Sequence, residues 1–282
     1  MPETTKEKLF SLTLFSTRVE FICQAVAAGV DEVIVDWEHI GKSERQAGAD
    51  TQINHDTLDD LRHVRACTSA RVICRINRFG QWTPSEVEMA IEAGADELLL
   101  PMVRCCDEVE SVLNMAGSRC GVGILVETVD AIHQASLLAK LPISRVYVGL
   151  NDLAIERHSS NIFVPLLDGT LESVRSAFKQ PFGFGGLTLP DRGHPVPCRL
   201  LIAEMARLNC QFSFLRRSFH RDIQGRDMAV EIPRLLQAIE QAHKRTPDSI
   251  AQDRRELEEA IHIILSRQID EDRTCLYKAS AL

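Results

Sequence analysis

The segment Ala27-Ala-Gly-Val-Asp-Glu-Val-Ile-Val35 recurs later in the chain as Glu92-Ala-Gly-Ala-Asp-Glu-Leu-Leu-Leu100. Each copy joins the end of an amphipathic stretch to a glycine, which suits the left-handed cap of a helix, and then to a short apolar run. Helix, cap and strand therefore form one unit that is used more than once. Such alternation predicts a parallel sheet whose strands are connected and covered by helices.

Eight apolar runs fit this strand pattern. They lie near residues 9–15, 32–37, 71–76, 97–102, 121–126, 145–150, 182–188 and 211–216. Eight strands with helices between them predict a single (β/α)8 barrel over residues 1–245, followed by a C-terminal helix and tail over residues 246–282. A doubly wound open sheet is the main alternative, but no Gly-x-Gly-x-x-Gly follows the first predicted strand and the chain has no Walker loop.

Charged residues stand where several of these runs end. Asp36-Trp-Glu-His39 closes the second run, Arg75 lies in the third, and Glu127 and Asp152 follow the fifth and sixth. The carboxyl ends of parallel strands meet at one face of a barrel, so these side chains are expected to share a site. Taken singly, each acid suits a helix cap and the arginine suits a structural ion pair. Together they predict a functional constellation in which the two later acids bind a metal.

Five segments resemble the HpcH/HpaI aldolase and citrate lyase beta-subunit superfamily, in order, over about residues 20 to 155. They are Asp36-Trp-Glu-His39, Arg75, Leu100-Pro-Met-Val103, Glu127-Thr and Gly149-Leu-Asn-Asp-Leu153. The resemblance implies a divalent cation, Mg²⁺ or Mn²⁺, held by the carboxylates of Glu127 and Asp152. Hard cations prefer such oxygen ligands, and two carboxylates leave positions open for the carboxylate and keto oxygen of a 2-oxo acid.

The same resemblance implies roles for the other residues. Arg75 is expected to bind substrate and to stabilise a developing oxyanion, and Asn151 and Asp152 to bind the substrate carboxylate. His39 is the expected proton carrier, since a histidine titrates near neutral pH. The resemblance suggests Asp36 and Glu92 as the acids that support His39, although most relatives have aspartate at the latter position.

Composition limits the partners of the protein. The net charge is −8 and the sequence pI is about 5.6, which argues against nucleic acid and anionic membranes. No apolar run reaches the roughly 18 residues of a membrane span. Nine cysteines without Cys-x-x-Cys spacing suit a reducing compartment, so we expect a soluble cytoplasmic protein.

The C-terminal region predicts one more amphipathic helix over about 249–267, with a loosely ordered end after residue 270. This helix is a candidate contact in a homo-oligomer, and packing on its own barrel is the equal alternative. Near the end of the eighth run, Arg216 and Arg217 are adjacent. Because side chains alternate along a strand, one of the two is expected to face the site.

The sequence thus predicts an aldolase that makes or cleaves a carbon–carbon bond between a 2-oxo acid of the pyruvate type and an aldehyde. A lyase or synthase for CoA thioesters, of the citrate lyase type, is the second hypothesis. A barrel that has lost catalysis and serves as a binding subunit is the third. Retention of His39, Arg75, Glu127 and Asp152 argues against the last.

Overall fold

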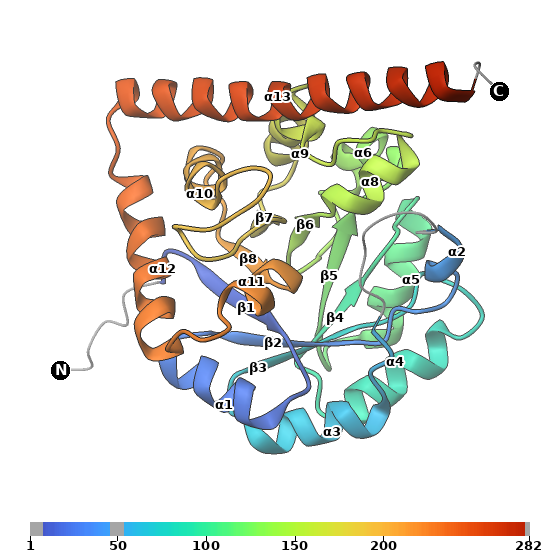
Figure 1. Ribbon diagram of the computed structural model, residues 1–282. Coiled ribbons are helices and arrows are strands. Elements are labelled where there is room, and N and C mark those ends of the chain that lie inside the picture. The colour runs from blue at the N-terminus through green and yellow to red at the C-terminus, as the bar shows by residue number, and fades with distance from the viewer. Residues whose placement is uncertain (1–7, 46–53, 280–282) are drawn as a thin grey trace.

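The computed structural model describes residues 8–45 and 54–279, which form a barrel of eight parallel strands surrounded by helices (Figure 1). The strands are β1 (Ser11–Phe15), β2 (Glu32–Asp36), β3 (Arg71–Arg75), β4 (Glu97–Leu100), β5 (Gly121–Val126), β6 (Val146–Val148), β7 (Phe182–Phe184) and β8 (Phe212–Leu215). Each of the eight predicted runs contains one of them. The prediction of a (β/α)8 barrel is confirmed.

The strands pair in the order β7-β6-β5-β4-β3-β2-β1-β8, and every pairing is parallel. The remaining seam, between β7 and β8, is closed by a backbone hydrogen bond of 2.9 Å from Gln211 N–H to the carbonyl of Phe182. Gly183 makes this approach possible, because a Cβ at that position would lie 2.3 Å from the carbonyl oxygen of Phe212.

Helices follow the strands and cover the outside of the barrel. They are α1 (Val19–Ala28), α2 (Lys42–Arg45), α3 (Leu58–Cys67), α4 (Thr83–Glu92), α5 (Cys106–Ala116), α6 (Val129–His133), α7 (Ala135–Leu138), α8 (Leu150–Glu156), the 3₁₀ turn Val164–Leu166, α9 (Thr170–Ala177), α10 (Cys198–Arg207), α11 (Arg217–Asp222), α12 (Met228–His243) and α13 (Pro247–Ala279). The repeated glycines behave as predicted, since Gly29 and Gly94 follow α1 and α4 with φ of 119° and 90°.

Two apolar layers hold the barrel together. The larger layer lies between strands and helices, and a smaller one fills the interior of the barrel. The interior residues are Phe15, Ile34, Ile73, Leu99, Leu125, Tyr147, Phe212 and Phe214. Because this layer packs the centre, the barrel is closed to solvent there and a ligand can bind only at its ends.

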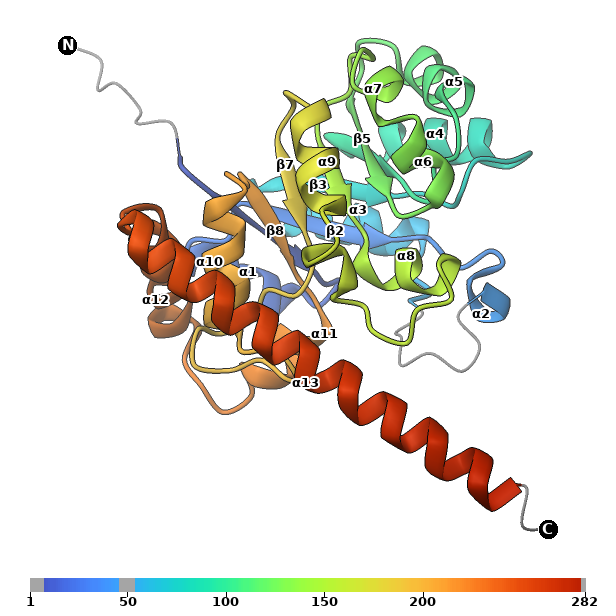
Figure 2. The same ribbon diagram turned by 90° about the horizontal axis from the view of Figure 1, so that it is seen from above.

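The C-terminal helix α13 runs along α10 and continues past the barrel (Figure 2). Leu257 and Ile261 are buried against the body of the protein. The helix extends to Ala279, well beyond the predicted end near residue 267. Neither proline nor glycine occurs after Pro247, so nothing in the sequence breaks the helix where its apolar pattern weakens. Within the described ranges, no helix has the length and apolarity to cross a bilayer.

A buried ion network fills the amino-terminal end of the barrel. The guanidinium of Arg145 donates two hydrogen bonds of 2.6 Å to Glu32 and two of 2.8 Å to Glu97. All three side chains are buried. Arg71 adds a second guanidinium at Glu97, with its Nε 3.1 Å from Oε2. Two arginines therefore balance the two carboxylates that close this end of the barrel.

Arg145→Ala is expected to lower the free energy of unfolding by about 3–5 kcal/mol, since Glu32 stays buried without a guanidinium and Glu97 keeps only Arg71. Urea unfolding followed by circular dichroism measures this loss. The matched control is Arg119→Ala, which removes an exposed pair with Glu88 and should cost no more than about 1 kcal/mol. Equal losses in the two variants would contradict the structural role of Arg145.

Candidate active site

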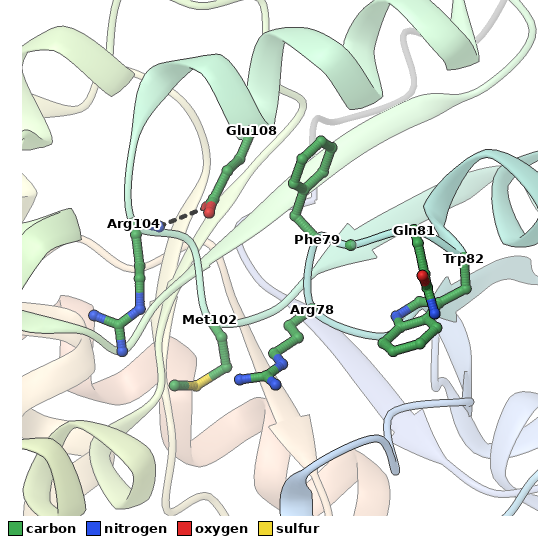
Figure 3. A pocket seen from close by; sticks show the side chains of 8 residues that line it. Arg78, Phe79, Gln81, Trp82, Met102, Arg104 and Glu108 are labelled. Carbon is green, nitrogen blue, oxygen red and sulfur yellow. Dashed lines mark hydrogen bonds between the residues drawn. The ribbon is translucent and has the colours of Figure 1, made fainter.

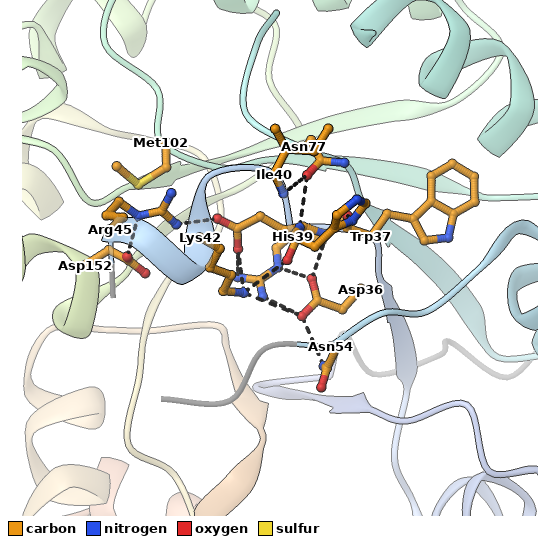
Figure 4. A network of polar contacts seen from close by, with 12 residues as sticks. Asp36, Trp37, His39, Ile40, Lys42, Arg45, Asn54, Asn77, Met102 and Asp152 are labelled. Atoms are coloured by element: carbon orange, nitrogen blue, oxygen red, sulfur yellow. Dashed lines mark hydrogen bonds and ion pairs between the residues drawn. The ribbon is translucent and has the colours of Figure 1, made fainter. Parts of the chain in front are cut away.

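The charged residues predicted from the strand ends do converge at the carboxyl-terminal end of the barrel. Asp36 ends β2, Arg75 ends β3, Glu127 follows β5 directly, and Asp152 lies in the first turn of α8, just after β6. Figure 4 shows Asp36 and Asp152 within one polar network that crosses the mouth of the barrel. The topology of the barrel therefore joins residues that are far apart in the sequence.

Arg75 is the centre of this network. Its Nε and Nη2 atoms donate hydrogen bonds of 2.8 and 2.6 Å to the two oxygens of Asp36, and its Nη1 lies 3.0 Å from Glu38. Only 3 % of Arg75 is exposed. Burial raises the pKa of Asp36, but the Arg75 guanidinium outweighs it and holds that pKa well below its usual range. Burial also raises the pKa of Glu38, but the positive charges of Arg75 and Lys42 outweigh it and lower that pKa to about 2.

Sequence reasoning missed Glu38 as a partner of Arg75. Asp36 and Glu38 are two residues apart at the end of a strand, so they face the same side, whereas Trp37 turns away and donates its indole N–H to the carbonyl of Thr57. This alternation was the available signal in Asp36-Trp-Glu-His39. The two acids form one clamp for a buried arginine.

Two cations of the short helix α2 complete the network, and neither was predicted. Lys42 is 1 % exposed, and its Nζ lies 2.8 Å from Glu38. Arg45 donates a hydrogen bond of 2.7 Å to Glu38 and another of 2.9 Å to Oδ1 of Asp152 (Figure 4). The spacing of Glu38 and Lys42, four residues apart, was a weak sequence signal, whereas nothing local indicates that Arg45 reaches α8.

Glu127 is buried, and Gly149 is what allows its position. A Cβ on Gly149 would lie 2.1 Å from Glu127 Oε2 and 2.9 Å from Glu127 Cβ, so the acid leans across the end of the next strand toward α8. Its other oxygen accepts a 2.9 Å hydrogen bond from the backbone N–H of Met102. Met102 has a positive φ of 55°, an uncommon conformation for a side chain other than glycine.

Among residues 8–45 and 54–266, no lysine, arginine or histidine forms a salt bridge with the Glu127 carboxylate. Burial, together with repulsion from Asp152 and Glu38, raises the pKa of Glu127 to about 8. Arg75 opposes this shift but already serves Asp36 and Glu38. A buried carboxylate beside other carboxylates is a site that a further positive charge would stabilise.

His39 is exposed at the edge of the site and is oriented by the backbone. Its Nδ1 lies 2.8 Å from the carbonyl oxygen of Trp37, and its backbone N–H donates to Asn77 Oδ1. Asn77 in turn donates a 2.6 Å hydrogen bond from Nδ2 to Glu86, and burial raises the pKa of Glu86. A carbonyl oxygen only accepts hydrogen bonds, so Nδ1 carries the proton and neutral His39 has its lone pair on Nε2.

The acids that were expected to support His39 lie elsewhere. Asp36 is engaged with Arg75. Glu92 is the last residue of α4 and is exposed, and a helix that precedes β4 ends at the amino-terminal side of the barrel. The structure therefore does not bring Glu92 to His39 within this chain. The acid of α4 that does lie in this region is Glu86, which precedes Glu92 in the helix and accepts a hydrogen bond from Asn77.

Asn151 and Asp152 lie where the prediction placed them, in the first turn of α8 after the N-cap Gly149. Asn151 is half-buried and Asp152 is buried. Of the two adjacent arginines after β8, Arg216 faces the site, with its Nη2 3.5 Å from Asp36, whereas Arg217 is exposed and begins α11. Arg216 thus joins the constellation from the eighth strand.

A cavity of about 500 Å³ opens beside the network (Figure 3). Its lining comes from the loop between β3 and α4 and from the segment after β4, and consists of Arg78, Phe79, Gly80, Gln81, Trp82, Met102, Arg104 and Glu108. Met102 borders both this cavity and the ion pair of Arg45 with Asp152 (Figure 4). The cavity therefore adjoins the carboxylates and offers room for a small ligand.

Comparison with known proteins agrees with this geometry. The family model for HpcH/HpaI aldolase/citrate lyase matches residues 10–161, more than half of the chain. The chain belongs to this family. The match includes every strand-end residue named above except Arg216, and family membership supports lyase chemistry of the aldolase or citrate lyase type in general. A comparison with curated proteins gives no match.

Solved structures with the same fold include three at low identity. RipC from Yersinia pestis is 14 % identical, with a TM-score of 0.57, and the alignment covers 86 % of this chain and 100 % of that one. Citrate synthase SbnG is 15 % identical, with a TM-score of 0.56 and coverage of 76 % and 89 %. The 3-hexulose-6-phosphate synthase from Salmonella typhimurium is 14 % identical, with a TM-score of 0.59 and coverage of 83 % and 100 %. At these identities the likeness shows the fold alone.

The family generally uses divalent metal ions, and the residues of this chain fit such an ion. Glu127 and Asp152 offer hard carboxylate oxygens from adjacent strand ends, and burial together with the charges of Asp152 and Glu38 raises the pKa of Glu127. Within the described residues, no group of three or more His, Cys, Asp or Glu side chains is arranged around a common point. Two carboxylates would therefore leave most coordination positions to water and substrate.

Gly149→Ala is expected to weaken Mn²⁺ binding by about 10- to 100-fold, because the new methyl group displaces the Glu127 carboxylate from its place beside α8. Electron paramagnetic resonance of free Mn²⁺ during titration measures the affinity. Gly80→Ala is the control, since a Cβ there meets nothing closer than 3.3 Å. An unchanged Mn²⁺ affinity in Gly149→Ala would show that ion binding does not require the Glu127 carboxylate to lie over Gly149.

Proposed function

We propose that the protein is a divalent-metal-dependent carbon–carbon lyase that cleaves or forms an aldol bond between a 2-oxo acid of the pyruvate type and an aldehyde. The observation that carries the proposal is the position of Glu127. Its carboxylate crosses over Gly149 toward Asp152, beside an arginine clamped by two other acids. Such a site can hold a hard cation and an anionic substrate side by side.

In the cleavage direction, the proton of the substrate hydroxyl is removed as the bond between C3 and C4 breaks. The electron pair of that bond passes into the enolate of the 2-oxo acid, which takes a proton at C3 to give the free acid. The hydroxyl carbon leaves as an aldehyde. A divalent cation held by Glu127 and Asp152 would supply Lewis-acid stabilisation of the negative charge on the oxo acid.

Arg75 fits the role of a fixed positive charge near that oxygen. Its guanidinium is held on three sides by Asp36 and Glu38, so it cannot turn away when charge develops, and no reorganisation is needed. His39 fits the role of proton carrier because Nε2 bears its lone pair when Nδ1 donates to Trp37. Asn77 and Glu86 position the backbone of this histidine rather than its ring.

The 2-oxo acid itself would approach from the cavity that Met102 borders. The backbone around Asn151 and Asp152 begins α8 and presents N–H groups at the same edge as Glu127. A substrate carboxylate there would lie between the two expected metal ligands. The aldehyde part would then extend away from β5 and β6, across the mouth of the barrel.

Exchange of the pyruvate methyl protons into D₂O, followed by NMR, tests the enolate chemistry without any knowledge of the aldehyde. We expect exchange with the native protein that requires Mg²⁺ or Mn²⁺, is abolished by a chelator, and falls by about 100-fold or more in Glu127→Gln. Glu88→Gln, which changes an exposed acid paired with Arg119, should exchange at the native rate.

Absence of exchange despite demonstrated metal binding would overturn the pyruvate-type proposal. Cleavage of a CoA thioester under the same conditions would then favour the citrate lyase type of reaction. Neither activity, with binding of an oxo acid retained, would indicate a barrel that acts as a binding subunit.

A further inference from the structure

Two cysteines from different helices meet on the outside of the barrel. Cys23 lies in the middle of α1, and Cys67 is the last residue of α3, the helix that packs beside α1 (Figure 1). The thiol of Cys23 donates a hydrogen bond to the carbonyl oxygen of Cys67, with Sγ and O 3.7 Å apart. Because α3 leads into β3, its last residue lies at the amino-terminal side of the barrel, away from the candidate active site.

The side chains of this pair differ in their access to solvent. Cys23 is exposed, whereas Cys67 is partly buried. The Sγ atom of Cys67 lies 3.2 Å from the carbonyl oxygen of Val64, which holds it against its own helix. Burial, followed by the neighbouring Cys23 thiol, raises the pKa of Cys67, so the two side chains are close enough to affect each other. One thiol is open to a reagent in solution, and a second thiol lies next to it.

We infer that Cys23 and Cys67 form a redox-active pair, which a peroxide converts to a disulfide and a dithiol converts back. The exposed Cys23 thiolate attacks one oxygen of hydrogen peroxide, the O–O bond breaks, and Cys23 becomes a sulfenic acid as hydroxide leaves. The Cys67 thiolate then attacks that sulfur, the S–O bond breaks, and a second hydroxide leaves. The protons from the two thiols convert both hydroxide ions to water. Two thiols are oxidised, and one peroxide is reduced.

Three other cysteines are poor candidates for this chemistry. Cys74, Cys198 and Cys210 are buried, and burial raises the pKa of each thiol. A buried, protonated thiol is a weak nucleophile that reagents do not reach. Oxidation by a small amount of peroxide is therefore expected to begin at an exposed thiol that has a neighbour to complete the disulfide.

The disulfide closes a covalent ring around part of the candidate active site. The ring runs from α1 through β2 to α3, so it includes Asp36 and His39. The start of α3 is already fastened to the end of β2, since the indole N–H of Trp37 donates to the carbonyl of Thr57 at 3.1 Å and Asp56 accepts the Asp36 N–H at 2.8 Å. A covalent link at the other end of α3 restricts the unfolded chain and stabilises this part of the fold.

Peptide mapping of the oxidised protein tests the pair directly. The native chain is treated with a small excess of hydrogen peroxide, blocked with a thiol reagent and digested without a reducing agent. Mass spectrometry is expected to find a peptide that joins Cys23 to Cys67, from a protein that stays monomeric on a denaturing, non-reducing gel. Dithiothreitol should return both residues to the free thiol.

Thermal unfolding followed by circular dichroism measures the effect on the fold. Oxidation is expected to raise Tm by about 5–10 °C in the native chain, and dithiothreitol should reverse the rise. Cys23→Ser and Cys67→Ser should each lose both the linked peptide and the rise in Tm. Cys120→Ser is the matched control, because it removes another partly buried thiol, just before β5, and should keep both.

Three results would overturn the inference. They are a disulfide between two copies of the chain, a linked peptide that joins other cysteines in place of this pair, and a rise in Tm that persists in Cys67→Ser. Accumulation of Cys23 sulfinic acid beside an unmodified Cys67 thiol would also count against it, because a neighbouring thiol should intercept the sulfenic acid first. None of these readouts uses lyase activity, so the inference is tested independently of the proposed function.

Discussion

The buried guanidinium of Arg75 is the constraint on which the mouth of this barrel depends. A charged side chain that is almost entirely removed from water must be hydrogen-bonded and neutralised. Asp36 and Glu38 do this from the end of β2, and in doing so they orient the strand end that carries His39. The acids are in turn shared with Lys42 and Arg45. Each charge therefore limits where its neighbours can lie.

The opposite side of the mouth depends on backbone rather than charge. Gly149 leaves room for Glu127, and the positive φ of Met102 directs an N–H group at the same carboxylate. The result is an acid that is held in place but poorly neutralised. The site therefore has two parts. Around Arg75 the carboxylates are neutralised by ion pairs and held in place. At Glu127 the carboxylate is poorly neutralised, which suits the binding of a cation.

Arg45 links the two parts, because it bridges Glu38 and Asp152. A guanidinium on one oxygen of Asp152 competes electrostatically with any cation at that carboxylate. The proposed binding of an ion at Glu127 and Asp152 would therefore be coupled to the position of α2. Sequence reasoning treated the two acids as free ligands and did not include this competition.

The sequence by itself determined the eight strands, the glycine caps and the positions of Asp36, Arg75, Glu127 and Asp152 at strand ends, because hydrophobic periodicity and local backbone preference are short-range properties. Only the tertiary structure decided the partners. Arg45 meets Asp152 across 107 residues, Glu86 rather than Glu92 approaches the histidine region, and Arg216 rather than Arg217 turns inward. Ion pairing depends on where helices end and on which lone pairs are already occupied. Those quantities exist only once the barrel has closed.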